Sequence, residues 1–413
     1  MSELVSKDKI RPIRNTISLD GALAIITANA APIDRKEDVS LFQANGRVLA
    51  SEIVAKIDVP PFDRAAMDGF AVIAEDTTGA NQQSPKKLRC LETVHSGDSP
   101  TKSVSRGTCT EIATGAPMPE GSNAVVMAEE THYGTNSDVN VLKPVLPLQH
   151  VGQCGADIKS GQSLLQPGSV LTPSRLGSIA ALGKATVKVF ERPQIAILST
   201  GNEIVEPGRS LGPGQIYDIN QFTLSAIIGE HGGTPTSYSI TTDTLNALEA
   251  IVESCLNNEP DILVFSGGSS VGKRDLTLDI LEKFGEVLFH GISIKPGKPT
   301  LFGRIGKIPV FGMPGYPTSC LSNAYMLLVP LLRRIAHLPP HRTQTVLLPT
   351  AKRFVSTVGK HQFYTVRIVN GTAVPAFKAS GDITSMSKAD GYIEIPEKTA
   401  SIEKGQLVEV RLF

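Results

Sequence analysis

The chain has 413 residues, and its 40 basic and 40 acidic side chains give a formal net charge of zero. Because a single hydrophobic core stops growing near ~250 to 300 residues, this length predicts roughly two to four domains. The balanced charge and the absence of tryptophan argue against the cationic surface and the aromatic stacking platforms that are typical of nucleic-acid-binding proteins.

The first part of the chain predicts two helices separated by a β-rich region. In residues 18–30, apolar side chains recur at helical spacing behind Ser18, which suits the cap of an amphipathic helix. A second helix is expected over residues 174–182, because Pro173 fits a first helical turn. We expect these helical regions to pack together as one discontinuous domain, formed by residues 15–47 and 159–188.

Short β-like runs separated by Pro, Gly and Asn lie between these helices. They are residues 70–73, 124–127 and 139–142. This pattern predicts a small all-β module over residues 48–158.

From residue 189 onward, apolar β runs alternate with helical patterns, the order expected for parallel strands joined by crossover helices. The predicted strands are residues 195–198, 238–240, 262–265 and 310–311. The predicted helices are residues 222–231, 245–256, 276–284 and 318–335. The pattern predicts a doubly wound α/β domain over residues 189–338.

After Pro339 and Pro340 the chain returns to short β runs joined by polar turns. The predicted strands are residues 345–348, 364–369, 392–395 and 407–410. We expect a small C-terminal β-barrel or sandwich over residues 339–413.

The cysteines and the N-terminal segment indicate a reducing compartment. The five cysteines are widely spaced and form no C-x-x-C pair, which argues against a zinc ribbon or a disulfide framework. Residues 1–15 lack the apolar run of a signal peptide, and no apolar stretch is long enough to span a membrane. We therefore expect a cytoplasmic protein with no membrane or nucleic-acid partner.

Three glycine-containing loops follow strands of the predicted α/β sheet. They are residues 199–203, 266–275 and 312–319, and a fourth segment, residues 294–299, adds Lys295 and Lys298. Ligands of open parallel sheets bind beyond the carboxyl ends of the strands, where backbone N–H groups and hydroxyls can hold anions. A lone Gly-Gly or Pro-Gly pair is usually only a turn. Three such loops at one edge instead predict an anion site.

Two acids lie in these same loops. Carboxylates beside phosphate are unfavourable unless a cation lies between them, and magnesium is the natural bridge. Glu203 and Asp275 are therefore candidate magnesium ligands. The chain lacks a G-x-x-x-x-G-K-[ST] loop, a G-x-G-x-x-G after the first α/β strand, a G-x-S-x-G elbow and an H-E-x-x-H helix. No histidine has a partner at ligand spacing, so none is assigned a role.

Seven segments, read in chain order, resemble the motifs of one family. Residues 60–71, PPFDRAAMDGFA, are similar to P-x-x-x-x-S-A-M-D-G-Y-A, and residues 113–119 and 123–126 are similar to T-G-A-x-x-P and A-V-V. The four α/β segments are similar to S-T-G-x-E-L, S-G-G-x-S-V-G-x-x-D, K-P-G-K-P and G-x-P-G-N-P-x-S. Together they resemble the molybdopterin molybdenumtransferase family, which includes the C-terminal domain of gephyrin.

The resemblance implies an elongated homodimer, in which residues 15–47 and 159–188 form a linker and dimerisation domain. Its active site would lie between the α/β domain of one subunit and the Asp68-bearing β module of the other. Local sequence alone favours an ordinary Asp-Gly turn for Asp68. The implied reaction is the magnesium-dependent insertion of molybdate into adenylylated molybdopterin with release of AMP, and other cofactor-biosynthesis proteins are candidate partners.

The resemblance also implies roles for individual residues. Catalytic roles fall on Asp68, Asp243, Asp275, Lys295 and Lys298, and magnesium is assigned to Glu203 and Asp275. Substrate binding falls on Thr114, Thr200, Gly201, Ser266, Gly267, Gly268, Ser269, Ser270, Pro314, Gly315 and Pro317. Asp157 resembles a further family acid. For Asp157 and Asp243, a solvated turn remains an alternative.

The chain departs from the family pattern at several positions. Ile219 replaces the Ser of D-S-N, Tyr316 replaces the Asn of G-x-P-G-N-P, and cations expected near Gly152 and Thr365 are missing. These changes leave open a divergent paralogue that binds the cofactor or scaffolds partners without turnover. A second alternative is an enzyme that inserts tungstate, because molybdate and tungstate share their charge and nearly the same size.

Overall fold

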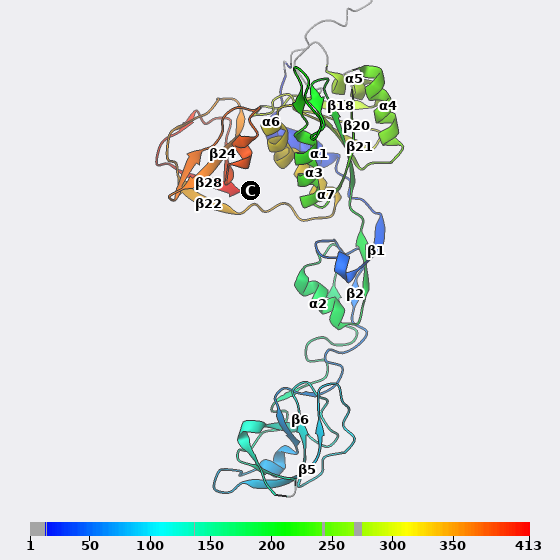
Figure 1. Ribbon diagram of the computed structural model, residues 1–413, viewed down its shortest axis with the longest axis vertical. Helices are drawn as coiled ribbons and strands as arrows, with labels where there is room; N and C mark the ends of the chain where they lie inside the picture. Colours follow the sequence, from blue (N-terminus) through cyan, green and yellow to red (C-terminus); the bar gives the residue numbers. More distant parts are fainter. Residues whose placement is uncertain (1–12, 14, 136, 242–243, 268–274) are drawn as a thin grey trace, which may run out of the picture. The chain divides into compact units, whose positions relative to one another are not determined.

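The computed structural model describes residue 13 and residues 15–135, 137–241, 244–267 and 275–413. The chain forms two compact units (Figure 1). Unit 1 comprises Met1–Glu37, Gly46–Val48 and Val189–Phe413, and unit 2 comprises Asp38–Asn45 and Leu49–Lys188. The chain passes between them in the paired strands β1 (Lys36–Ser40) and β12 (Thr186–Phe190). Within the described ranges, no helix has the length and apolar character needed to cross a membrane.

A six-stranded sheet forms the centre of unit 1. Its first four strands are parallel to one another. The fifth runs antiparallel to them, and the sixth, which pairs antiparallel with the fifth, runs in the same direction as the first four. In spatial order the strands are β16 (Thr234–Thr241), β13 (Gln194–Thr200), β17 (Ile262–Ser266), β21 (Ile308–Met313), β20 (Leu301–Ile305) and β18 (Glu286–His290). The four parallel strands confirm the predicted α/β sheet.

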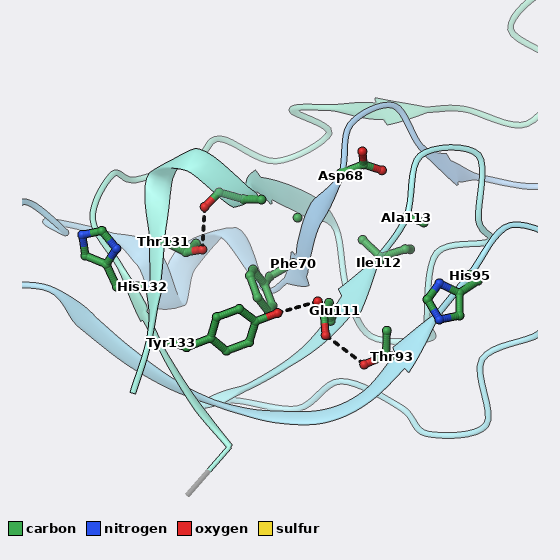
Figure 2. Close-up of a pocket in the computed structure, with 12 residues that line it drawn as sticks. Asp68, Phe70, Thr93, His95, Glu111, Ile112, Ala113, Thr131, His132 and Tyr133 are labelled. Carbon is green, nitrogen blue, oxygen red and sulfur yellow. Dashed lines mark hydrogen bonds between the residues drawn. The ribbon is translucent and has the colours of Figure 1, made fainter. Parts of the chain in front are cut away.

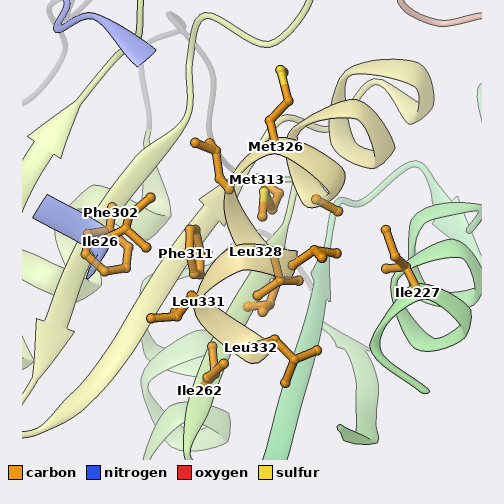
Figure 3. Close-up of a cluster of buried hydrophobic side chains, with 14 of the residues drawn as sticks. Ile26, Ile227, Ile262, Phe302, Phe311, Met313, Met326, Leu328, Leu331 and Leu332 are labelled. Carbon is orange, nitrogen blue, oxygen red and sulfur yellow. The ribbon is translucent and has the colours of Figure 1, made fainter. Parts of the chain in front are cut away.

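Each central strand contributes alternate side chains to two cores, because successive strand residues point to opposite faces. In β13, Ile195 and Ile197 join one core, while Ala196 and Leu198 join the other. Helices α1, α3, α6 and α7 lie on the first side of the sheet, and α4 and α5 lie on the second (Figure 1). The first core is drawn in Figure 3, where Phe311 and Ile262 of the sheet lie among leucines of α7. The sheet is buried on both faces.

The helices follow the predicted segments closely. Ser18 caps the first helix by accepting a hydrogen bond from the backbone N–H of Gly21. The predicted helix over residues 318–335 is divided by a π-helical segment, Ala324–Leu328. The helices of unit 1 are α1 (Leu19–Ala28), α3 (Asn220–Glu230), α4 (Leu245–Leu256), α5 (Leu276–Phe284), α6 (Pro317–Asn323), α7 (Val329–Ile335) and α8 (Thr384–Ser387).

The C-terminal region of unit 1 forms a second sheet, as predicted for a small β domain. Strand β19 (Ile294–Lys295) joins this sheet by pairing parallel to β24, which ties the lysine-bearing segment to the C-terminal strands. The other strands of the sheet are β24 (His361–Val369), β26 (Gly391–Ile395), β28 (Leu407–Leu412), β22 (Thr345–Pro349) and β25 (Thr372–Pro375). Two further pairs are β14 (Ile204–Val205) with β15 (Ile216–Tyr217), and β23 (Phe354–Val355) with β27 (Ser401–Ile402).

Unit 2 contains the predicted all-β module and the second predicted helix, α2 (Pro173–Ala181), whose first residue is Pro173. The six-stranded sheet has the order β7 (Ala124–Met127), β4 (Gly69–Val72), β6 (Thr108–Ile112), β5 (Lys86–Val94), β9 (Asp138–Val141) and β8 (Thr131–Tyr133). Two short pairs complete it, β2 (Ile53–Val54) with β11 (Ser163–Leu165), and β3 (Arg64–Ala65) with β10 (Val151–Gly152). Helix α1 instead belongs to unit 1, where Leu19, Ala22 and Ile26 pack in the core of the α/β region, so the expected packing of the two helices together is not observed among the described residues. The other domain boundaries stay a prediction.

Candidate functional site

Three of the predicted loops meet at the carboxyl edge of the parallel strands in unit 1. Ser199, Ser266 and Met313 occupy neighbouring register positions on β13, β17 and β21, so the residues that follow them leave the sheet together. Gly267 has a φ of +88°, and a Cβ built on it would lie 2.4 Å from the carbonyl oxygen of Thr200. A Cβ on Gly315 would lie 3.6 Å from the Cα of Gly267. Only glycine permits this approach at position 267.

Glu203 lies beside Gly201 at the end of the first loop. A Cβ on Gly201, whose φ is +148°, would lie 2.9 Å from Glu203 Oε1. The side chain of Glu203 is exposed, and its backbone carbonyl accepts a hydrogen bond of 2.8 Å from the N–H of Ile216. Glu203 therefore presents a solvent-accessible carboxylate next to the glycine turn.

Two residues that were given no role from the sequence, Asp218 and Asn220, are buried at the same edge. Asp218 Oδ1 accepts a hydrogen bond of 3.1 Å from the N–H of Gln221, which lies in the first turn of α3. Asn220 Nδ2 donates a hydrogen bond of 2.9 Å to the carbonyl oxygen of Gly315. The D-x-N spacing at positions 218–220 was the only sequence signal for these two residues. The structure shows in addition that both side chains are buried.

Several buried polar atoms at this edge lack a hydrogen-bond partner among the described residues. They are Ser199 Oγ, Thr200 Oγ1, Asp218 Oδ2 and Asn220 Oδ1. Buried polar groups are almost always satisfied in folded proteins, so these atoms point to contacts made by something else. Residues 268–274, which include the predicted Gly268, Ser269 and Ser270, lie outside the described residues, as does Asp243.

We call the close approach of Thr200, Gly267 and Gly315 the glycine cradle, and helix α6 begins directly after its Gly315 turn. Pro317 is its first residue, a position that suits proline because the missing N–H has no intrahelical partner. Pro314, just before it, is buried. Burial raises the pKa of the Cys320 thiol to about 12, although a hydrogen bond with Ser266 acts in the opposite direction. Cys320 is thus a neutral packing residue beneath Ser266.

Asp275 begins α5 and is 3% exposed. Its Oδ1 accepts a hydrogen bond of 3.1 Å from the N–H of Leu278, so the carboxylate caps the helix. Its Oδ2 lies 3.3 Å from His290 Nε2. These two atoms are not aligned for a hydrogen bond, and neither has one among the described residues. The contact is an ion pair only when His290 is protonated.

Lys295 and Lys298 lie in a loop that is fixed to α6. Asn323 Nδ2 donates a hydrogen bond of 3.1 Å to the carbonyl oxygen of Gly297, and a Cβ on Gly297 would collide with that amide. Lys295 Nζ donates to Thr357 Oγ1 at 3.0 Å, and Lys298 Nζ donates to the carbonyl oxygen of Ile13 at 3.2 Å. Within the described part of the chain, neither ammonium forms an ion pair with a carboxylate. Both therefore keep their positive charge available.

Asp68 lies in unit 2, at the turn before β4. Its Oδ1 accepts hydrogen bonds from the backbone N–H of Thr114 at 2.6 Å and from Thr114 Oγ1 at 2.9 Å. The backbone bond, followed by the hydroxyl bond, lowers the pKa of the Asp68 carboxyl below its ordinary value. The next residue must be glycine, because a Cβ on Gly69 would lie 1.9 Å from the carbonyl oxygen of Val126. Asp68 is an exposed, ionised carboxylate.

The oxygen-rich edge fits a magnesium site in its chemistry, since Mg²⁺ prefers oxygen ligands. Asp275 Oδ2 is buried without a hydrogen bond among the described residues, and Glu203 is accessible. The described residues contain no group of three or more His, Cys, Asp or Glu side chains placed to hold a metal. Magnesium commonly uses one or two carboxylates and completes its shell with water and substrate phosphates, so two ligands would suffice.

The positions where the chain departs from the family motifs differ in their surroundings. Tyr316 is 66% exposed, and Ile219 precedes the first residue of α3. Thr365 is fully buried in β24, and Gly152 pairs with Arg64 in the short β10–β3 sheet. Asp157 is exposed. Only Tyr316 among them presents a large side chain to solvent beside the glycine cradle.

Models of three protein regions match the chain in order. A model described as "MoeA N-terminal region (domain I and II)" matches residues 17–183, one described as "Probable molybdopterin binding domain" matches residues 196–334, and one described as "MoeA C-terminal region (domain IV)" matches residues 348–413. Together these three models account for most of the chain.

Known proteins resemble the chain over nearly its whole length. A crystal structure of the molybdopterin biosynthesis MoeA protein from Pyrococcus horikoshii has a TM-score of 0.83 and 40% identity, and the match covers 96% of this chain and 99% of that one. Molybdopterin molybdenumtransferase 2 of Mycobacterium tuberculosis is 33% identical over 385 residues, with 90% and 94% coverage. The molybdopterin molybdenumtransferase of Haemophilus influenzae is 31% identical over 384 residues, with 91% and 94% coverage. The chain therefore belongs to the molybdopterin molybdenumtransferase family and is an enzyme of that type, with a role in molybdenum cofactor biosynthesis.

Proposed function

We propose that this enzyme inserts molybdate into adenylylated molybdopterin in a magnesium-dependent reaction that releases AMP. The proposal rests on the close approach of Thr200, Gly267 and Gly315 at one edge of the sheet. Buried side-chain oxygens at the same edge have no hydrogen-bond partner among the described residues. An edge of this kind suits a phosphorylated ligand, because exposed backbone N–H groups bind anionic oxygens. Membership of the family supplies the substrate class.

In this proposal the glycine cradle holds the phosphates, together with Gly201, Ser266, Gly268, Ser269 and Ser270. Pro314 and Pro317, which have no N–H, would shape the turn that carries Gly315. Hydroxyls such as Thr200 Oγ1 would donate to phosphate oxygens. Asn220 would keep the Gly315 turn in place through its hydrogen bond of 2.9 Å. Binding through the phosphates positions the dithiolene for the metal and the phosphoanhydride for cleavage.

Lys295 and Lys298 are the proposed molybdate ligands. Molybdate is a tetrahedral dianion, and ammonium groups that lack a carboxylate partner among the described residues can neutralise it. Each contacts only a neutral oxygen in the structure, Thr357 Oγ1 and the carbonyl of Ile13. Both contacts can be exchanged for an oxyanion without leaving a buried carboxylate unpaired.

Magnesium would be held by Glu203 and Asp275, and when bound it would supply positive charge to the phosphoanhydride. Asp275 keeps one oxygen for the cap of α5 and has the other, Oδ2, without a hydrogen bond among the described residues. Asp243 is proposed as a further acid at this site. We also propose a homodimer, in which Asp68 acts on substrate held by the partner subunit, and a cytoplasmic location, which the five free thiols support.

The lysine assignment is tested by a matched pair of variants. Loss of a charge-assisted contact costs about 1.5 to 3 kcal/mol, so Lys298→Met is expected to lower kcat/KM for molybdate roughly tenfold or more. Lys307→Met is the control, because Lys307 is an exposed residue in the turn between β20 and β21. Equal kcat/KM values for molybdate in the two variants would show that Lys298 does not bind molybdate.

A second candidate function is cofactor binding without turnover, which Tyr316 favours. Its exposed ring stands where the family motif has an asparagine, next to the cradle residue Gly315. Calorimetry and AMP release separate the two functions. Tight pterin binding with background AMP release would support the binding protein, whereas AMP release that depends on molybdate supports the enzyme. Competition between molybdate and tungstate in the same assay tests the choice of metal.

A further inference from the structure

A pocket of about 460 Å³ lies in unit 2 next to Asp68. The function proposed above names no ligand for this pocket. Asp68 stands at one end of the residues that line it, with Phe70, Glu111 and Tyr133 arranged below (Figure 2). All of its lining residues belong to unit 2, so the pocket is complete within that unit.

One wall of the pocket is an aromatic ring that is held in place by a carboxylate. The Tyr133 hydroxyl donates a hydrogen bond of 2.5 Å to Glu111 Oε1, and Thr93 Oγ1 donates one of 2.8 Å to Glu111 Oε2 (Figure 2). The Tyr133 ring packs edge-on against Phe70, with 5.7 Å between ring centroids. Tyr133 as a whole residue is nevertheless 66% exposed. Its ring is a fixed flat surface that is open to a ligand.

The charge of the lining disfavours an oxyanion. The described residues that line the pocket include two carboxylates, Asp68 and Glu111, two histidines, His95 and His132, and no lysine or arginine. Phosphate or molybdate would be repelled there, because like charges at close range are unfavourable. Each oxygen of Glu111 can accept a further hydrogen bond, since a carboxylate oxygen has two lone pairs and only one is used by Thr93 or Tyr133. The pocket therefore favours a ligand that has N–H donors and a flat face and carries no negative charge.

We infer that this pocket binds the flat, amino-bearing heterocycle of the substrate, with the ring against Tyr133 and its N–H groups directed at Glu111. Adenine and the pterin are the two sources of this chemistry in an adenylylated pterin, so the identity of the ligand rests on the proposed function. In this inference the loops of unit 1 bind the anionic groups of the substrate, and the pocket of unit 2 binds its neutral ring.

The experiment is calorimetric titration of the full-length protein with adenosine, with 6-hydroxymethylpterin and with inorganic phosphate. At least one of the two rings is expected to bind the wild-type pocket, and the one that binds identifies the source. Stacking on an aromatic side chain contributes about 1 to 3 kcal/mol, so Tyr133→Ala is expected to weaken that ligand roughly fivefold or more. Tyr133→Phe keeps the ring and should lose less affinity. Glu111→Gln should also weaken the ligand.

Two control variants lie in unit 2 but outside the pocket. Phe42→Ala removes an aromatic side chain that is fully exposed, and Glu52→Gln neutralises a carboxylate that, like Glu111, accepts two side-chain hydrogen bonds. Both should bind the ring as the wild type does. An intermolecular NOE between the ligand and the Tyr133 ring in the wild type gives the same answer without any substitution.

The inference is overturned if neither ring binds the wild-type protein, or if folded Tyr133→Ala protein binds as tightly as Phe42→Ala protein. AMP release measured in parallel keeps the two proposals apart. Turnover with no Tyr133-dependent binding refutes the pocket and leaves the transferase intact. Tyr133-dependent binding with no turnover supports the pocket and refutes the transferase.

Discussion

The side-chain amide of Asn220 donates a hydrogen bond of 2.9 Å to the carbonyl oxygen of Gly315. This bond joins the first residue of α3 to the loop after β21 and connects two segments that are 95 positions apart in the sequence. Asn220 is 6% exposed, so its position is set by packing, whereas Gly315 is exposed. The buried residue thus holds the exposed turn in place.

Asn220→Ala is expected to loosen the Gly315 turn with a modest loss of stability. Removing one hydrogen bond costs about 1 kcal/mol, because the exposed carbonyl of Gly315 can bind water instead. The KM for the adenylylated substrate should rise more than kcat falls. Chemical denaturation and steady-state kinetics measure the two effects, and an unchanged KM would contradict the role of Asn220 in positioning the turn.

Gly267→Ala and Gly315→Ala are expected to differ sharply. At position 267, φ is +88° and the new Cβ would lie 2.4 Å from the Thr200 carbonyl, so strain and collision should cost at least about 1 to 3 kcal/mol. At position 315 the nearest atom would lie 3.6 Å away, an ordinary contact. Gly315→Ala should therefore fold like the wild type. Equal melting temperatures for the two variants would show that the backbone at Gly267 is not constrained as described.

Thr114→Val is expected to raise the pKa of Asp68 part of the way back to its ordinary value. The variant removes the hydroxyl donor and keeps the backbone N–H, which is the larger cause of the lowered pKa. A lowered carboxyl pKa favours the folded state above the unfolded pKa, and this contribution disappears as pH falls through the folded pKa. The acid limb of the pH–rate profile should move to higher pH.

Carbon-13 NMR titration of the Asp68 carboxyl measures this shift directly. Glu52 is an internal reference, since Ser163 and then Gln166 lower its pKa independently of Thr114. A variant in which Asp68 and Glu52 both titrate as in the wild type would show that the Thr114 hydroxyl does not act on Asp68.

Asp275→Asn and Asp275→Ala separate the structural role of this residue from its proposed metal role. Asn is a good helix cap and should preserve the stability given by the bond to Leu278, whereas Ala should lose about 1 kcal/mol. Both variants should need more magnesium for half-maximal activity, because both lose the charge. If Asp275→Asn responds to magnesium as the wild type does, Asp275 is only a helix cap.

Strong periodicity made the helices of the α/β region predictable. The helices predicted over residues 245–256 and 276–284 are observed as α4 (Leu245–Leu256) and α5 (Leu276–Phe284). Their apolar faces repeat at helical spacing, and Asp275 stands at the cap position of α5. Local chemistry and tertiary packing agree in these segments, so the sequence alone was sufficient.

Strands β20 and β18, which pair antiparallel, were not predicted, although β18 reads EVLFH and has a strand-like composition. The local strand signal of β20 is weak. β20 reads LFGRI, and glycine inside a strand weakens the pattern. The structure explains Gly303: a Cβ there would lie 2.3 Å from the carbonyl oxygen of Glu286 on β18. β5 was missed for a different reason, since its residues KKLRCLETV are mostly polar and few are buried. The strand conformation of β20 and of β5 is therefore determined by pairing with neighbouring strands.

The candidate site was predictable in outline and incomplete in detail. Glycine turns after strands indicated that Thr200, Gly267 and Gly315 converge, because parallel strands end at one edge. Burial of Asp218 and Asn220 depends on the packing of α3 and could not be read from three residues. The Tyr133–Glu111 bond joins different strands of unit 2, and neither residue belongs to a motif.

The central claim is tested most directly by single-turnover reconstitution of the purified protein with magnesium, molybdate and adenylylated molybdopterin, with chromatographic measurement of AMP and of molybdenum-loaded cofactor. We expect both products in equal amounts, and neither when molybdate or magnesium is left out. Folded protein that binds the adenylylated pterin but forms no molybdenum-loaded cofactor, and releases AMP only at background level, would contradict the account.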